Sequence, residues 1–340
     1  MRIVTLTWFV ICASVASFVN AQDPVTNDSD LQIDTDFGDN VLEYEFPAFE
    51  VGIAEYPDGP TGVTVLHFEN PASVAVDIRG GSPGFLGNYG IVNAISLAGG
   101  SLLGLEAASG VAGGIFEERE YSTNWLDIPL VSAGVIFDFR QRDDSIYPDK
   151  RLGRAAYDNI TTNQFPMGAR GAGISATVGK LVDFEAGESA GQGAAFQDED
   201  GVKIFACVIL NAVGVIYDRQ GNVVLGEMEA ESRVRSNLDT KLERLIGSGR
   251  GTQYHDRPTG NTTLTVVVTN QTIWGFNLVQ QARQVHSSMA RAIQPFHTPT
   301  DGDVLWMVST SEAEMTDLSL TDFGIMASEV VWDAVLEAQP

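Results

Sequence analysis

The sequence has few basic residues. Its 340 residues include 20 lysines and arginines against 45 aspartates and glutamates, so the formal net charge at neutral pH is −25. A protein with this charge repels phosphate backbones and anionic lipid headgroups. The composition therefore argues against nucleic acid as a partner. It also argues against a membrane partner once the N-terminal segment described below has been removed.

Cysteine and histidine are too sparse and too scattered for a structural metal site. The two cysteines and four histidines form neither an HExxH pattern nor paired CxxC motifs. A faint calcium-loop pattern at residues 34–39 lacks the terminal glutamate of such loops. Cys207 lies in the apolar run 204–210, which is typical of a buried strand where a thiol behaves as a small hydrophobe. We therefore expect no metal, no other cofactor and no catalytic cysteine.

Residues 1–21 have the pattern of a signal peptide. Arg2 precedes an apolar run over residues 4–19, and Val19-Asn20-Ala21 provides a cleavage site with a small last residue. The apolar run is shorter than the roughly 20 residues that a membrane-spanning helix needs, which favours export over an uncleaved anchor. The sequence thus predicts a periplasmic or secreted protein that starts near Gln22 and contains no intramolecular disulfide.

The exported chain is expected to form one domain after a short arm. Residues 22–50 are acidic, with little apolar periodicity up to Asn40, and predict a solvated arm. Residues 51–340 show no break in composition, although the polar stretch 227–260 predicts a long loop. Strand-like runs occur at 62–67, 74–78, 94–98, 131–137, 202–210, 213–217, 264–269 and 304–309, and helical periodicity at 102–118, 274–293 and 322–336. This pattern predicts an α/β protein whose sheets are covered by helices.

Two serine or threonine positions are candidate nucleophiles. Residues 187–191 match the GxSxG motif, but a strand follows where the motif needs a helix, so we interpret the match as a coincidence. Thr262 follows Asn261 where a loop enters a β-branched strand. Its hydroxyl can attack the Asn261 carbonyl and thereby free an α-amine with a pKa of about 7.7–8.0, which can act as a base. By itself, the same pattern is also typical of an ordinary turn before a strand.

Six runs of residues, taken in order, resemble one enzyme family. They are 76–84, 97–101 with 104–108, 176–180, 211–214, 261–263 and 297–303. They resemble the motifs of the L-aminopeptidase/D-esterase family, which includes β-peptidyl aminopeptidases and the nylon-oligomer endohydrolase. The resemblance implies a four-layer α/β/β/α sandwich similar to N-terminal-nucleophile hydrolases. It also implies self-cleavage between Asn261 and Thr262 into chains 22–261 and 262–340, assembled as a homo-tetramer of αβ units.

The resemblance also implies roles for individual residues. Thr262 is the expected nucleophile, and Asp301 and Asp303 match the acidic pair that orients and activates it. Lys180 and Asn211 match positions that line the site, where Asn211 is an expected oxyanion donor. A lone lysine after Thr-Val-Gly or a lone Asp-Gly-Asp is usually a plain turn. Together, these groups are the parts that an acyl-transfer site requires.

One position departs from the pattern of the nylon-oligomer branch. Phe137 aligns with a tyrosine that lines the site in that branch, and a phenylalanine cannot donate a hydrogen bond. Tyr147 is a candidate substitute. The loss of one oxyanion donor lowers the rate by roughly 10²–10³. Phe137 therefore supports an alternative hypothesis, in which the chain is a catalytically weakened member of the family that acts as a binding protein.

The leading hypothesis is a self-processing hydrolase of a small peptide, amide or ester. The same acyl-enzyme also permits transfer of the acyl group to an acceptor other than water. Asn261 lies in an N-x-S/T sequon, and a glycan there would crowd the bond to be cleaved, which favours a bacterial source.

Overall fold

The structure is a computed structural model. It describes residues 25–139, 142–181, 187–226, 260–315 and 318–340, with isolated positions 228, 243 and 247. The predicted signal peptide and nearly all of the predicted loop 227–260 lie outside the described residues. Among the described helices, none has both the length and the apolar character needed to cross a bilayer.

A ten-stranded sheet of the described residues folds back on itself along its longest strand, β3 (Thr61–Ile78). Residues 61–67 of β3 pair with β2 (Glu50–Tyr56), and residues 63–67 and 72–73 pair with β5 (Ile91–Ala98). The last six residues of β3 pair with β17 (Val304–Ala313). On the β17 side follow β15 (Thr262–Gln271), β12 (Val202–Asn211) and β11 (Gln192–Glu199). On the β5 side follow β6 (Val131–Val135) and β4 (Phe85–Leu86), and β7 (Thr161–Thr162) pairs with β2. The shared strand thus joins two sheet layers.

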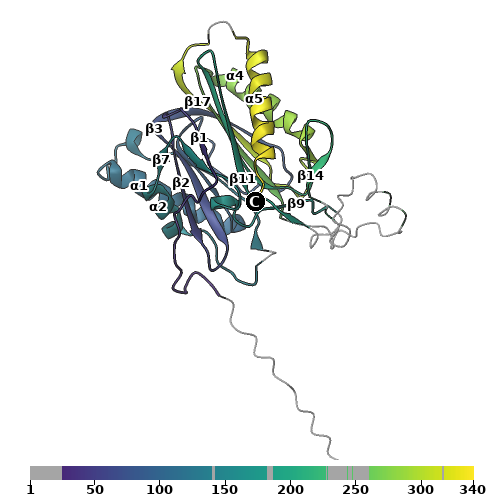
Figure 1. Ribbon diagram of the computed structural model, residues 1–340. Helices are drawn as coiled ribbons and strands as arrows, with labels where there is room; N and C mark the ends of the chain where they lie inside the picture. Colours follow the sequence, from purple (N-terminus) through teal and green to yellow (C-terminus); the bar gives the residue numbers. More distant parts are fainter. Residues whose placement is uncertain are drawn as a thin grey trace, which may run out of the picture.

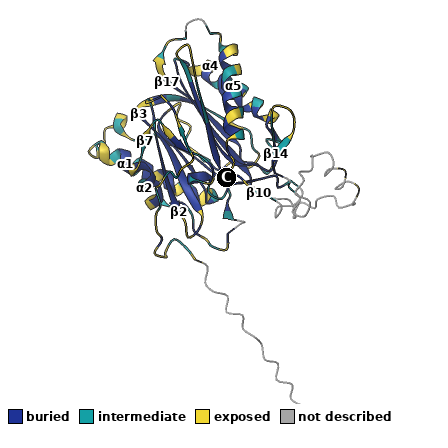
Figure 2. Ribbon diagram, in the orientation of Figure 1, coloured by how far each residue is buried: buried dark blue, intermediate teal, exposed yellow. Residues whose placement is uncertain are grey.

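Three apolar clusters fill the spaces between four layers. One lies between the two sheets, one between β12, β15, β17 and the helices α4 (Gly275–Ser288) and α5 (Leu320–Leu336), and one between β2, β3, β5 and the helices α1 (Ala107–Glu118) and α2 (Lys150–Asp158). Figure 1 shows the two helix pairs on opposite sides, and Figure 2 shows that the sheets between them are buried. The predicted α/β/β/α sandwich is therefore confirmed.

Strand β12 shows how the sequence builds these layers. Successive side chains of a strand point to opposite faces. Cys207 and Ile209 therefore face the other sheet, while Ala206 and Val208 face the helices. Because both faces are covered, the strand is apolar throughout, which is why the run 204–210 is predictable. Cys207 is fully buried and burial raises the pKa of its thiol, as expected for an inert cysteine.

The rest of the described secondary structure is short. The predicted helix 102–118 begins as a 3-10 helix, η1 (Ser101–Glu106), and continues as α1. Further short elements are η2 (Trp125–Asp127), η4 (Gly171–Gly173), η7 (Met289–Arg291), β9 (Thr177–Val178), β10 (Glu188–Ser189), β13 (Val215–Tyr217), β14 (Val223–Leu225) and β16 (Ile293–Gln294). The helix α2 had no apolar periodicity long enough to be predicted. Its N-terminus is capped by the Asp149 side chain, which accepts from the Leu152 N–H.

The predicted solvated arm over residues 22–50 is shorter than expected. The strand β1 (Val41–Glu43) pairs with β8 (Gln164–Pro166), and the buried rings of Tyr44, Phe46 and Phe49 pack in the cluster between the sheets. Burial of each aromatic ring removes a large apolar area from water. The free energy gained in this way outweighs the tendency of the neighbouring acidic residues to stay in solvent. The sandwich therefore includes residues that the sequence analysis assigned to the arm.

We predict that Trp306 in β17 is a main contributor to stability. Its ring is fully buried between the sheets, and its Nε1 donates to Ser132 Oγ at 2.7 Å. The substitution Trp306→Ala should lower the free energy of unfolding by about 3–5 kcal/mol, measured by urea denaturation and circular dichroism. Trp274, which is 72% exposed, provides the control, since its replacement should change stability by less than about 0.5 kcal/mol. Equal losses for both variants would contradict the predicted packing role.

Candidate active site

The predicted nucleophile lies where β15 and β17 begin side by side. The two strands are parallel neighbours, with Leu264 in register with Val304. The residues that precede them pair as well, because Asn261 forms a parallel bridge with Asp301. The Thr263 N–H donates to Asp303 Oδ1 at 2.8 Å. Parallel pairing therefore brings together two segments that are 40 residues apart in the sequence.

The carbonyl oxygen of Asn261 accepts two hydrogen bonds. Thr262 Oγ1 donates to it at 2.5 Å and the Gly302 backbone N–H at 2.8 Å. A Cβ atom at residue 302 would lie 2.6 Å from Thr262 Oγ1, so this close approach requires a glycine. The buried hydroxyl of Thr262 thus rests against the carbonyl group of the preceding residue, which is polarised by a second donor.

Asn211 and Lys180 form the neighbouring part of the site. Asn211 ends β12 in register with Thr262. Its Oδ1 accepts from Lys180 Nζ at 2.8 Å and from the Thr177 N–H at 3.1 Å. Its Nδ2 donates to the carbonyl oxygens of Phe137 at 3.1 Å and Gly260 at 3.4 Å. The lysine and the Thr177 amide therefore fix the Asn211 side chain with its donor toward the backbone that leads to Thr262.

Lys180 and Asp301 have pKa values displaced in opposite directions. Complete burial lowers the pKa of Lys180 to about 7, although the Asp301 carboxylate opposes the shift. Burial, followed by the negative charge of Asp303, raises the pKa of Asp301 to about 6. Thr298 limits this second shift, because its hydroxyl donates to Asp301 Oδ2 at 2.5 Å and its N–H at 3.1 Å. Both groups can therefore exchange protons near neutral pH.

Asp303 is held by three N–H donors. Its Oδ1 accepts from Thr263, and its Oδ2 accepts from the backbone N–H of His297 at 3.1 Å and from His297 Nδ1 at 3.0 Å. The carboxylate is completely buried. It accepts a hydrogen bond from the residue after Thr262, so its position and that of the predicted nucleophile are linked.

A cavity of about 370 Å³ opens beside Thr262. Apolar side chains and hydroxyls line it, among them Leu102, Val135, Phe137, Ser82, Ser101 and Thr300, and none of the described residues around it is charged. The Phe137 ring packs against Gly260, where a Cβ atom would lie 2.2 Å from the ring. Phe137 thus contributes apolar surface and a carbonyl acceptor. Tyr147 does not replace the missing donor, because its hydroxyl donates to Glu106 at 3.1 Å and it does not line this cavity.

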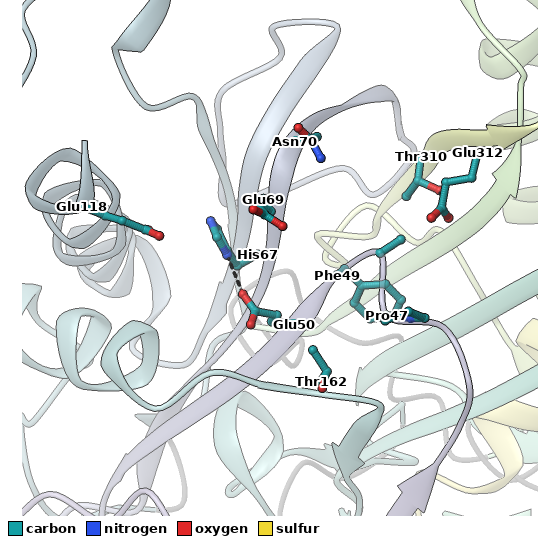
Figure 3. A pocket seen from close by; sticks show the side chains of 11 residues that line it. Pro47, Phe49, Glu50, His67, Glu69, Asn70, Glu118, Thr162, Thr310 and Glu312 are labelled. Carbon is teal, nitrogen blue, oxygen red and sulfur yellow. Dashed lines mark hydrogen bonds and ion pairs between the residues drawn. The ribbon is translucent and has the colours of Figure 1, made fainter.

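A second cavity, of about 510 Å³, lies at the opposite end of β17. Glu50, His67, Glu118 and Glu312 are among its lining residues, and Figure 3 shows the His67 ring bonded to Glu50. Within the described part of the chain, no group of acidic, histidine or cysteine side chains has the arrangement of a metal site. Its described lining includes the threonines Thr162 and Thr310 but none of the predicted site residues, so the candidate active site is the cavity beside Thr262.

The structure brings Thr262, Asp301, Asp303, Asn211 and Lys180 into one network, as the sequence motifs predict. The serine of the GxSxG match, Ser189, is exposed in β10 and followed by the strand β11. It therefore lacks the turn into a helix that such a nucleophile requires. Sequence reasoning missed Gly302 and the two histidines behind Asp303. Gly302 and His297 both lie within the run 297–303, so their place in this motif could have indicated a role in the site.

The profile of peptidase family S58 matches residues 46–339. The chain belongs to peptidase family S58. A 6-aminohexanoate-oligomer endohydrolase of Agromyces sp. (strain KY5R) is 44% identical over 311 residues, which cover 88% of this chain and 86% of the relative. An enzyme of the same name from Kocuria sp. (strain KY2) has the same identity and coverage. This S58 chain is accordingly an amide-bond hydrolase by family.

Solved structures agree with the S58 assignment at the level of the fold. The L-aminopeptidase D-Ala-esterase/amidase of Ochrobactrum anthropi, described as a variant of the Ntn hydrolase fold, matches with a TM-score of 0.58 and 16% identity. The match covers 88% of this chain and 84% of that one. A β-aminopeptidase of Burkholderia sp. matches with a TM-score of 0.57 and 16% identity, over 86% and 84% of the two chains. The predicted fold relationship is therefore confirmed.

We predict that Lys180 makes stability rise with pH. Its pKa is about 7 in the folded chain and about 10.4 in the unfolded chain, so the unfolded chain binds more protons between these values. Because proton release from the unfolded chain requires a higher pH, the free energy of unfolding should rise by about 2 kcal/mol between pH 7 and pH 9. Urea denaturation at both pH values should show that Lys180→Met removes this increment, whereas Lys150→Met at an exposed position keeps it. An unchanged increment in Lys180→Met would contradict the buried, pKa-shifted amine.

Proposed function

We propose that this S58 chain is an exported, self-processing amide hydrolase. It cleaves its own backbone between Asn261 and Thr262 and then uses the new N-terminal threonine as its nucleophile. The observation that carries the proposal is the pair of donors on the Asn261 carbonyl oxygen, the Thr262 hydroxyl and the Gly302 N–H. The Gly302 N–H is placed to stabilise the oxyanion that would form if the adjacent Thr262 hydroxyl attacked this carbonyl group.

The self-cleavage has two steps. Thr262 Oγ1 forms a bond to the carbonyl carbon of Asn261 while the bond from that carbon to the Thr262 nitrogen breaks, and the hydroxyl proton passes to that nitrogen. The Gly302 N–H stabilises the oxyanion that forms in between. Water then hydrolyses the ester, which leaves a carboxylate on Asn261 and a free α-amine and hydroxyl on Thr262. The products are residues 22–261 and 262–340.

The mature reaction uses the same groups. The α-amine of Thr262, with an ordinary pKa of about 7.7–8.0, takes the proton of its own hydroxyl, which attacks the substrate carbonyl. Asp301 and Asp303 hold this N-terminus. Asn211 Nδ2 bonds the Gly260 carbonyl in the uncut chain, and after cleavage it can donate to the substrate oxyanion instead. Lys180 keeps the Asn211 amide in that orientation.

The cavity beside Thr262 favours a neutral substrate segment. Because the described lining other than Asn261 and Thr262 is apolar or hydroxylic, the part of a substrate that lies away from the cleaved bond would find no ion-pair partner there. A linear amide with methylene groups between its amide bonds matches this lining. The 44% identical relatives are named as endohydrolases of 6-aminohexanoate oligomers. We therefore propose a nylon-type oligoamide, or a small peptide, amide or ester of similar shape, as the substrate.

The location and the assembly of the enzyme are part of the proposal. The signal-peptide pattern of residues 1–21 supports a periplasmic or secreted enzyme. Large exposed apolar side chains, including Trp125 at 84% and Leu126 at 83%, support burial in contacts between subunits. We propose a homo-tetramer of αβ units.

We predict that Thr262→Ala abolishes self-cleavage. Wild-type protein should separate into two fragments on a denaturing gel, while the variant stays a single chain because it lacks the attacking hydroxyl. Thr263→Ala is the matched control, since the Thr263 hydroxyl is buried beside the site but belongs to the next residue. The control should cleave as the wild type does. Cleavage of Thr262→Ala at the same bond would contradict the assignment of the nucleophile.

A second candidate function is a weakened member of the family that retains the fold and binds its ligand without turning it over. Phe137 favours it, because a ring without a hydroxyl lines the cavity at the position where the resemblance to the nylon-oligomer branch implies a tyrosine. We predict that Phe137→Tyr raises kcat on an oligoamide by about tenfold or more, part of the 10²–10³ that one oxyanion donor contributes. Product formation measured by chromatography checks this. A wild type that is as fast as the variant would contradict the weakened-enzyme interpretation.

A further inference from the structure

Two histidines, one buried and one half-buried, lie behind Asp303. His297, in the segment before β17, donates from Nδ1 to Asp303 Oδ2 at 3.0 Å. His286, in α4, donates from Nδ1 to Asp77 Oδ2 at 3.0 Å. The two rings are in contact, with centroids 4.4 Å apart and planes at 81°. The His286 side chain is completely buried, and that of His297 is 19% exposed.

The hydrogen bonds determine which nitrogen carries the proton. Carboxylate oxygens only accept, so Nδ1 of each ring must be protonated. The Nε2 atoms of both rings are buried and have no hydrogen-bond partner among the described residues. Burial lowers the pKa of His286, and the neighbouring His297 lowers it further, while the hydrogen bond to Asp77 opposes both. The hydrogen bonds thus place a proton on Nδ1 of both rings, and burial favours the neutral form of His286.

Contacts with β3, α4 and β15 hold the two histidines and their carboxylate partners in place. Arg79, after β3, donates from Nε to Asp77 Oδ2 at 2.5 Å and from Nη2 to the Arg283 carbonyl of α4 at 3.1 Å. Phe296 packs on both histidine rings. The charged groups that face the pair are therefore Asp77, Arg79 and Asp303. Asp303 Oδ1, the oxygen that does not contact His297, accepts from the backbone N–H of Thr263, the residue after the proposed nucleophile.

We propose that His297, supported by His286 and Asp77, is a positioning residue that fixes the orientation of the Asp303 carboxylate and, through it, the position of Thr262. This role rests on the proposed function and concerns what holds Asp303 in place. His297 does not line the cavity beside Thr262, so it acts through Asp303. It has a left-handed backbone conformation, with φ at 59°, which brings both its N–H and its Nδ1 to the same carboxylate oxygen.

Kinetics separate this role from a merely structural one. His297→Ala removes the Nδ1 donor and should reduce kcat on an oligoamide roughly tenfold to a hundredfold with little change in KM, and it should slow self-cleavage similarly. His297→Asn keeps a donor near the Nδ1 position and tolerates the left-handed backbone. It should restore rates to within about threefold of the wild type. No loss in His297→Ala, or no recovery in His297→Asn, would overturn the proposal.

His67 provides a matched control. It is also a buried histidine that bonds a glutamate through Nδ1, Glu50 at 3.1 Å, but it lies at the second cavity. His67→Asn should therefore leave kcat and self-cleavage unchanged, even if it lowers stability as much as His297→Ala does. If both substitutions reduce kcat equally, the effect is structural and the proposal fails.

A second measurement does not depend on activity. The chain has four histidines, so nitrogen-15 labelling of histidine gives resolvable imidazole signals in long-range NMR spectra. In the uncut Thr262→Ala chain, His297 should be the Nδ1–H tautomer, and Asp303→Asn should change its signals. An Nε2–H tautomer would overturn the inference whatever the enzyme does. A correct tautomer in a chain that neither cleaves itself nor hydrolyses amides would instead refute the proposed function alone.

Discussion

The parallel pairing of β15 with β17 is the constraint on which the site depends. Both strands begin at the same edge of the sheet, and their register extends to the bridge between Asn261 and Asp301. This single alignment places the Gly302 N–H on the Asn261 carbonyl and the Asp303 carboxylate on the Thr263 N–H. A shift by one residue would turn Asp303 to the other face of the strand and remove both contacts. The apolar clusters on both faces of β15 and β17 hold the register.

Burial shifts the pKa values of polar groups in the site. Desolvation acts on Lys180 and Asp301 in opposite directions and brings both pKa values close to neutral. A buried amine and a buried carboxyl are costly in a folded protein unless hydrogen bonds satisfy them. Here Asn211 accepts from the amine, and Thr298 donates twice to the carboxyl. Such paired displacements are typical of sites that move protons.

Much of this arrangement follows from the sequence. The runs 204–210 and 264–269 are apolar because each strand is covered on both faces, so their identity as strands is predictable. The order of the motifs predicts five site residues, and the structure places them close together: Thr262, Asp301, Asp303, Asn211 and Lys180. The prediction of a solvated arm was wrong for residues 41–50. Their acidic side chains suggest exposure, but the aromatic rings between them are buried.

Other features depend on contacts that no local pattern encodes. Asp77 and His286 are 209 residues apart, and only the packing of α4 against β3 brings them together. The need for a glycine at residue 302 comes from the approach of Thr262 Oγ1, which exists only in the folded register. In the same way, the packing of the Phe137 ring on Gly260 exists only in the folded chain.

Self-cleavage as proposed would make Thr262 an N-terminus. Intact mass spectrometry of purified wild-type protein, with N-terminal sequencing of the smaller fragment, would detect this change. We expect two fragments, one that ends at Asn261 and one that begins at Thr262 and runs to Pro340. A single chain after prolonged incubation, or fragments that meet at any other bond, would contradict it.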